Sequence, residues 1–156
     1  MKIKKIVNLM MGLSFSLCIF AQDDWQLVWS DEFDTDGSLN SSVWNFEQGY
    51  ARNEEVQWYQ SDNAVCKNGL LIIEARKEQN RKNPLYVSGS NDWRKKREFI
   101  DYTSSSVTTA GKKEFLYGRF EVRARIPVAK GAWPAIWTLG SSAEWPLCGE
   151  IDILEY

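Results

Sequence analysis

The chain has 156 residues, enough for one domain with a substantial hydrophobic core. Its 19 basic and 21 acidic residues give a net charge of −2, so it lacks the basic surface expected of a nucleic-acid-binding protein. Histidine is absent, which excludes Ser-His-Asp and Cys-His catalysis and the common histidine zinc sites within this stretch. Carboxylates are therefore the natural carriers of any chemistry.

The first 21 residues have the layout of a secretory signal peptide. Lysines near the start precede the uncharged, largely apolar residues 6–20, and Ala21 supplies a small residue for cleavage. The apolar run is too short for a stable membrane span. A lipid anchor at Cys18 is the alternative, but Leu17 is bulky where such a site needs a small residue. We therefore expect a mature protein that is secreted, periplasmic or at the cell surface, with no membrane span.

Short strands separated by turn signals dominate the remaining sequence. Residues 119–126 show the clearest alternation of apolar and polar side chains, and Pro127 ends that pattern. No segment has the periodicity of a three-turn amphipathic helix, and residues 78–99 are polar and irregular, which predicts a long loop. Many short, mostly antiparallel strands favour an all-β sandwich or jelly roll, with a barrel as the alternative. The other strands are predicted at residues 25–30, 70–76, 133–139 and 149–156.

Two features outside the strands leave alternatives open. Cys66 and Cys148 remain after export, and they either form a disulfide in an oxidising compartment or are small buried apolar residues. The basic cluster 94–97 is either a solvated loop or a loop that borders a sugar-binding cleft.

The acidic row Glu150, Asp152 and Glu155 carries the strongest indication of chemistry. In a regular strand, Glu155 would point to the face opposite Glu150 and Asp152. A β-bulge near Ile153 and Leu154 adds one residue and returns Glu155 to the face of the other two acids. Three carboxylates on one face repel each other, which is a poor choice for a purely structural strand. The row makes sense if it faces a cleft and its carboxylates hold unequal protonation states, as paired catalytic acids do.

Aromatic residues support that interpretation, because the eight tryptophans suit stacking against sugar rings. Trp133, Trp137 and Trp145 precede the acidic row, and the first two share a face if their segment is a regular strand. The alternatives are that these tryptophans are core residues and that the acids form a solvated strand at a sheet edge.

Several sequence blocks, taken in order, resemble glycoside hydrolase family 16, and within it the bacterial laminarinases, which are endo-β-1,3-glucanases. The resemblance covers residues 25–156, nearly the whole mature chain, and its last two blocks are the most specific. The blocks are WSDEF at 29–33, RNEEVQWY at 52–59, NGLLI at 68–72, YGRFEVR at 117–123, GAWPAIW at 131–137 and WPLCGEID at 145–152.

The resemblance implies a concanavalin-like jelly-roll sandwich of two bent antiparallel sheets and hydrolysis with retention by double displacement. Glu150 is then the nucleophile, Glu155 the general acid/base and Asp152 the residue that orients the nucleophile. The positions resembling sugar-contacting residues are Asn53, Trp133, Trp137 and Trp145. No cofactor is required, although Glu32 resembles a position near the structural calcium that some members bind.

The spacing E-x-D-x-x-E argues against lichenases and xyloglucan transglycosylases, which resemble E-x-D-x-E. It leaves agarases and porphyranases open, so β-1,3-glucan is the expected substrate and a galactan the alternative. A sugar-binding jelly roll without catalysis is another alternative. We expect a monomer that binds polysaccharide.

The chain stops at Tyr156 within an apolar strand. We therefore interpret residues 22–156 as the N-terminal portion of a catalytic domain, truncated after the catalytic motif. A polypeptide with these open sheet edges is expected to fold poorly and to show little activity on its own.

Overall fold

The computed structural model describes residues 25–156, so the predicted signal peptide and Cys18 lie outside the described residues. Internal contacts divide the chain into two units, Met1–Ser30 and Asp31–Tyr156. Residues 25–30 of the first unit form no strand, so the prediction of a strand there is wrong. Alternating side chains favour an extended backbone, but a strand also needs a hydrogen-bonded neighbour, and no described strand pairs with this segment. All that follows concerns the second unit.

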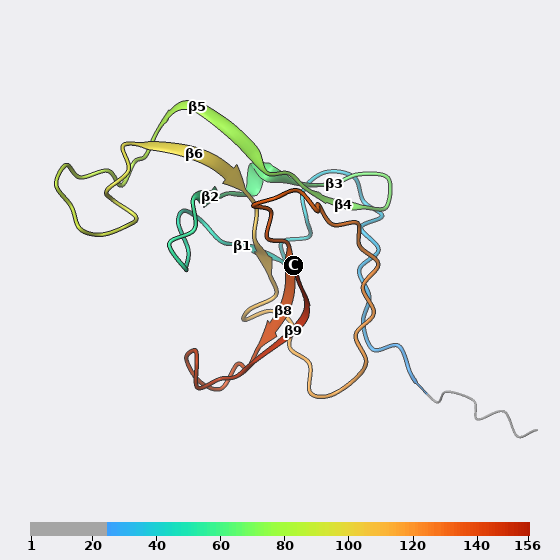
Figure 1. Cartoon of the computed structure of the whole chain (residues 1–156). Coiled ribbons are helices and arrows are strands. Elements are labelled where there is room, and N and C mark those ends of the chain that lie inside the picture. Colours follow the sequence, from blue (N-terminus) through green and yellow to red (C-terminus); the bar gives the residue numbers. More distant parts are fainter. Residues whose placement is uncertain (1–24) are drawn as a thin grey trace, which may run out of the picture. The chain divides into compact units, whose positions relative to one another are not determined.

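The second unit is built from short strands (Figure 1). Within residues 25–156 there is no α-helix and hence none long enough to cross a membrane, and the helical element present is the 3₁₀ turn η1 at Ser61–Asn63. The all-β prediction is confirmed. The strands are β1 (Asn45–Phe46), β2 (Gln57–Tyr59), β3 (Ala64–Cys66), β4 (Leu71–Ile73), β5 (Arg76–Lys82), β6 (Phe99–Ser104), β7 (Val107–Thr108), β8 (Ala135–Leu139) and β9 (Glu150–Glu155).

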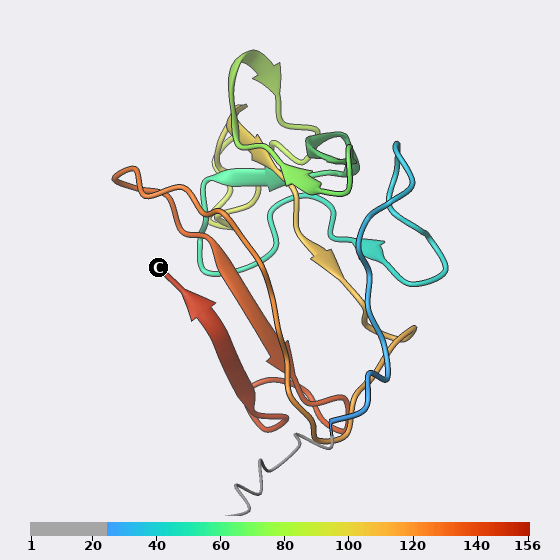
Figure 2. The ribbon, with the colours of Figure 1, turned by 90° about the vertical axis from the view of Figure 1, so that its right-hand side faces the viewer.

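The described strands form four small sheets, which are β1–β7, β2–β6–β5, β3–β4 and β8–β9. None of these sheets closes on itself. Strands β2 and β6 are parallel, an exception to the antiparallel pattern predicted from the sequence, while the other pairs are antiparallel. Strands β8 and β9 lie side by side at the C-terminal end of the chain, drawn in orange and red in Figure 2.

Three predicted segments differ from the structure. Residues 119–126 form no strand, although apolar and polar residues alternate in their sequence, because no strand within residues 25–156 pairs with their backbone. The strand predicted at 70–76 is divided into β4 and the start of β5. Strand β5 continues to Lys82 and β6 begins at Phe99, so the predicted loop is shorter and spans residues 83–98.

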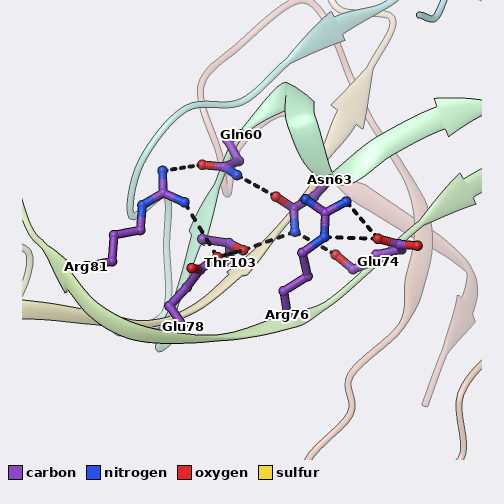
Figure 3. A network of polar contacts seen from close by, with 7 residues as sticks. All are labelled: Gln60, Asn63, Glu74, Arg76, Glu78, Arg81 and Thr103. Carbon is purple, nitrogen blue, oxygen red and sulfur yellow. Dashed lines mark hydrogen bonds and ion pairs between the residues drawn. The ribbon is translucent and has the colours of Figure 1, made fainter. Parts of the chain in front are cut away.

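A closed ring of polar side chains joins β5, β6 and η1 (Figure 3). Gln60 donates to Asn63 over 2.6 Å, and Asn63 donates to the hydroxyl of Thr103 over 3.1 Å. Thr103 donates to Glu78 over 2.6 Å, and Arg81 closes the ring through Glu78 and Gln60. Asn63 and Thr103 are almost completely buried. Since buried polar groups are costly unless hydrogen-bonded, removing one member of the ring would leave its buried partners unsatisfied. The apolar core around it contains Leu39, Tyr50, Tyr59, Cys66 and Ile100.

The loop at residues 83–98 packs against the segment that follows β1. Arg94 donates to the backbone oxygen of Tyr50 over 3.3 Å, and its guanidinium lies over the ring of Trp93 at 4.8 Å. Lys96 forms an ion pair of 3.9 Å with Glu54, next to Asn53. The basic cluster therefore fastens the loop beside a segment predicted to contact sugar, and its charges are engaged with acidic groups and carbonyl oxygens.

Both described cysteines are free thiols, so the disulfide alternative for Cys66 and Cys148 is not formed. Cys66 is buried at the end of β3, as expected for a small apolar residue. Burial raises the pKa of its thiol, and the nearby charges of Asp31 and Asp36 raise it further.

Candidate active site

The acidic row lies on β9, and its register with β8 determines where each carboxylate points. Residues Ala135, Trp137 and Leu139 alternate along β8 and so share one face. Their cross-strand partners are Glu155, Asp152 and Glu150, respectively. Directly opposed residues lie on the same face of an antiparallel pair, so all three carboxylates share the face of Trp137.

This arrangement depends on a β-bulge at Ile153. The register pairs Ile136 with Leu154 but pairs the next residue of β8, Trp137, with Asp152. Ile153 is thus the extra residue of β9, which confirms the bulge predicted from the spacing of the acids. Without the bulge Glu155 would lie on the opposite face.

The connection between β8 and β9 brings Trp145 to Glu150. Gly140 begins this connection directly after β8, where a Cβ atom would stand 2.2 Å from the backbone oxygen of Cys148, so only glycine allows this close approach. Nε1 of Trp145 donates a hydrogen bond of 2.9 Å to Oε2 of Glu150. The Trp145 side chain is otherwise well exposed, at 65%. Its ring therefore stands beside the carboxylate and is open to a ligand.

A second tryptophan contacts the other end of the row. Nε1 of Trp133 donates to Oε1 of Glu155 over 3.2 Å, and Trp133 is 58% exposed. Trp133 precedes β8, so it is not part of the regular strand assumed in the sequence analysis. Two exposed indoles thus flank the three carboxylates and hydrogen-bond to the outer two.

Arg52 contacts the site from a distant part of the sequence, and the sequence analysis assigned it no role. Its guanidinium carbon lies 5.3 Å from the ring centroid of Trp137 and 5.8 Å from that of Tyr59. Nη2 of Arg52 donates to both carboxylate oxygens of Glu47, which also accepts a hydrogen bond from the Ser106 hydroxyl. Burial alone would lower the pKa of Arg52, but the hydrogen bond and negative charge of Glu47 outweigh it and raise the pKa.

Tyr59 forms a small hydrogen-bonded group beneath Arg52. Its hydroxyl donates to Glu55 over 2.9 Å and accepts from Gln57 over 2.8 Å. Burial, together with the nearby Glu55, raises the pKa of Tyr59 to about 12. The residue stays neutral at ordinary pH and fixes the strand below Arg52. A run of charged and aromatic residues at 47–59 was the signal in the sequence for this cluster.

The structure does not bring the remaining predicted site residues, Asn53 and Glu32, together with the carboxylates. Asn53 is exposed in a turn closed by a 3.1 Å hydrogen bond from Glu55 to the oxygen of Arg52, and no hydrogen bond within residues 25–156 joins its side chain to the acidic row. Glu32 is exposed as well. No group of three or more Cys, Asp or Glu side chains among the described residues is arranged to hold a metal ion.

The site thus combines three carboxylates on one strand face with exposed tryptophans. A family model described as "XgeA-like, catalytic GH16 domain" matches residues 44–156, which include this whole face. The chain belongs to glycoside hydrolase family 16 (GH16). The family predicted from the sequence blocks is confirmed.

Curated relatives of this GH16 chain include two glucanases. A beta-glucanase of Rhodothermus marinus is 42% identical over 142 residues, which cover 85% of this chain and 44% of the relative. A glucan endo-1,3-beta-glucosidase of Cryptopygus antarcticus is 38% identical over 152 residues, covering 92% of this chain and 50% of the relative. The chain spans about half the length of the curated relatives it matches.

Solved GH16-type structures are similar as well. The laminarinase from Rhodothermus marinus is 41% identical with a TM-score of 0.66, over 85% of this chain and 50% of the laminarinase. A structure from a study of endo-acting O-glycanases, by which members of the human gut microbiota initiate mucin breakdown, is 43% identical with a TM-score of 0.72. That match covers 82% of this chain and 47% of the other. These likenesses confirm the predicted jelly-roll fold class.

Proposed function

We propose that the protein hydrolyses internal β-1,3-glucosidic bonds of a laminarin-type glucan, with retention of anomeric configuration. The observation that carries the proposal is the shared face of Glu150, Asp152 and Glu155, which the bulge at Ile153 creates. Glycosidases use a pair of carboxyl groups flanking the scissile bond, and the retaining enzymes hold the two close together.

In this proposal each acid has a separate role. Glu150 attacks the anomeric carbon and forms a covalent glycosyl-enzyme intermediate. Glu155 protonates the leaving oxygen and then activates the water that hydrolyses the intermediate. Asp152, between them on the same face, orients Glu150. The reaction needs no cofactor, and a structural calcium near Glu32 stays a prediction.

The indole groups support binding of a sugar chain at this face. Trp133 and Trp145 are exposed beside Glu155 and Glu150, and indole rings stack on the apolar faces of sugars. Asn53 is a further sugar-contacting residue in the proposal. The protein would act as a monomer on an extracellular polysaccharide, exported by the signal peptide predicted at residues 1–21.

The glucan is favoured as substrate because the two curated relatives described above, at 42% and 38% identity, are glucanases. A galactan is the second candidate. A relative from Sphingobacterium multivorum, the keratan-sulfate endo-1,4-beta-galactosidase, is 31% identical over 87% of this chain and 30% of its own length. The same carboxylates would act on either polymer, so this alternative changes the substrate and leaves the mechanism unchanged.

The test uses the full-length gene product on laminarin, lichenan and agarose, with reducing ends measured over time. Glu150→Ala and Glu155→Ala should each lose hydrolysis, whereas the exposed Glu114→Ala serves as a matched control and should retain it. Full activity of Glu150→Ala would overturn the assignment of the nucleophile. Wild-type activity on agarose without activity on laminarin would replace the glucan by a galactan.

A further inference from the structure

Arg52 contacts Trp137, a residue of the carboxylate face, but none of the proposed catalytic steps uses Arg52. Its guanidinium covers the ring of Trp137, and Trp137 stands directly across from Asp152 in the β8–β9 register. Opposed residues of an antiparallel pair have Cα atoms only about 4.5–5.5 Å apart, so the tryptophan that Arg52 contacts is an immediate neighbour of the acidic row. The contact joins residues 85 positions apart in the sequence, since 137 minus 52 is 85.

Glu47 fixes the orientation of Arg52 and leaves some of its donors free. Both oxygens of Glu47 accept from Nη2, and Ser106 holds Glu47 in turn. Within residues 25–156, Nε and Nη1 of Arg52 have no hydrogen-bond acceptor. The side chain of Arg52 is 31% exposed, so part of it is accessible to a ligand. A guanidinium is planar and carries five N–H donors, which suits it to adjacent oxygen atoms.

The charges around Arg52 select the kind of ligand. Glu47 neutralises the guanidinium, and the nearby face carries three carboxylates. An anionic sugar would therefore meet net negative charge, which disfavours sulfated or carboxylated units. The hydroxyl groups of an uncharged sugar meet no such repulsion and accept hydrogen bonds from the free N–H donors.

We propose that Arg52 is a substrate-binding residue that donates hydrogen bonds to hydroxyl groups of an uncharged sugar unit at this face. Trp137 then has a different role from the one predicted from the sequence. One face of its indole is covered by the guanidinium, so it holds Arg52 in place, and sugar stacking falls to the more exposed Trp133 and Trp145. This inference rests on the proposed glycosidase function and assigns the chemical class of its substrate.

The experiment compares Arg52→Leu and Arg52→Lys with Arg76→Leu in the full-length gene product. Arg76 is a matched control, because it forms an ion pair of 2.7 Å with Glu74 on the exposed part of β5. Steady-state kinetics on laminarin give kcat and KM. Binding of laminari-oligosaccharides is measured by calorimetry in a Glu150→Gln background, where turnover does not interfere.

Arg52→Leu should raise both KM and Kd about tenfold or more, the effect of losing a charged hydrogen bond, and should change kcat less. Arg52→Lys keeps the charge beside Glu47 but not the planar fork. The melting temperature of Arg52→Lys should return to that of wild type, while its KM should stay as high as that of Arg52→Leu. A purely structural ion pair would not give this outcome. If KM and Kd of Arg52→Leu equal those of Arg76→Leu, the inference is overturned.

A double-mutant cycle tests the role of Trp137. If Trp137 acts by holding Arg52, then Trp137→Leu should add little to the KM of Arg52→Leu. Independent, additive effects would show that Trp137 binds sugar by itself and would overturn its assignment as a support for Arg52.

Failure of the glycosidase proposal is recognised separately, from the wild type alone. If wild type does not hydrolyse laminarin, the glucanase function fails, and the Arg52 variants are measured on whichever of agarose, lichenan or a sulfated galactan the wild type cleaves. A preference for the sulfated galactan would overturn the uncharged-sugar assignment. Wild type that neither cleaves nor binds any of these polymers would overturn both proposals.

Discussion

The indole N–H of Trp145 donates to Glu150 over 2.9 Å, so the residue proposed as nucleophile is held by a side chain from the hairpin that precedes its own strand. The Trp133–Glu155 contact at the other end of the row is equivalent in kind and slightly longer, at 3.2 Å. Each outer carboxylate thus accepts one hydrogen bond from an indole N–H, through one of its two oxygens. The two tryptophans are therefore suited to orient the acids as well as to contact sugar.

Trp145→Phe should lower kcat on laminarin about threefold to tenfold, because it keeps a ring for stacking but removes the hydrogen bond that orients Glu150. The effect is smaller than that of a buried charged hydrogen bond because Trp145 is well exposed. Trp25→Phe is the control, since Trp25 is similarly exposed at 61% and belongs to the first unit. An unchanged kcat for Trp145→Phe would show that the hydrogen bond does not orient the nucleophile.

Exchange of Leu154 and Glu155, by the double substitution Leu154→Glu and Glu155→Leu, should abolish activity, because the carboxylate then lies opposite Ile136 on the other face of the strand. Ile153→Ala is the informative control, as it shortens the side chain but keeps the extra backbone residue and should retain most of the activity. Laminarin hydrolysis measured beside a circular dichroism melt separates loss of the site from loss of folding. Substantial hydrolysis by the exchanged variant would show that catalysis does not require the carboxylate of Glu155 on this face.

Retention through a covalent intermediate predicts how azide rescues the acidic variants. In Glu155→Ala, azide enters after the intermediate forms and should yield a β-glycosyl azide, because Glu150 still makes the first displacement. In Glu150→Gly, azide takes the place of the nucleophile and should yield an α-glycosyl azide from an activated β-glucoside. Nuclear magnetic resonance of the products distinguishes the two anomers. The reverse pattern would exchange the roles of the two glutamates.

Thr103→Val should lower the free energy of unfolding by about 1–3 kcal/mol, because the Asn63 amide and the Glu78 carboxylate each lose a buried partner. Valine fills nearly the same volume, so the loss reports on the polar ring and not on packing. Urea denaturation of the full-length gene product measures it. The exposed Thr35→Val should stay within about 0.5 kcal/mol of wild type. Equal stabilities of the two variants would contradict the role of the ring.

Alkaline pH should destabilise the protein through Tyr59. Its pKa is about 12 in the folded state against a usual value of 10.0, so the folded protein binds this proton more tightly than the unfolded chain. The contribution to stability is complete below pH 10.0 and is lost as the pH rises through about 12. Its size is at most about 2–3 kcal/mol.

The measurement is the unfolding free energy of wild type and Tyr59→Phe across that pH range. The difference between the two should shrink as the pH rises, since phenylalanine has no proton to lose. The exposed Tyr102→Phe is the control and should keep a constant difference from wild type. A constant difference for Tyr59→Phe would contradict the raised pKa.

The sequence alone determined the class of the fold and the identity of the acids. The absence of histidine and the spacing of Glu150, Asp152 and Glu155 are local properties, and even the bulge at Ile153 followed from counting residues along one strand. Strand period is equally local, which is why β8 and β9 were predicted close to their observed bounds. The same local reasoning was wrong for residues 119–126, because a strand also needs a neighbour that its own sequence does not specify.

Only the tertiary structure decided which distant residues meet at the site. The placement of Arg52 over Trp137, the support of Arg52 by Glu47 and Ser106, and the docking of the loop at 83–98 on Tyr50 all join segments far apart in the chain. Such contacts depend on the course of the backbone between them. The sequence pattern of a single segment does not specify that course. The contact between Arg52 and Trp137 could therefore be identified only from the structure.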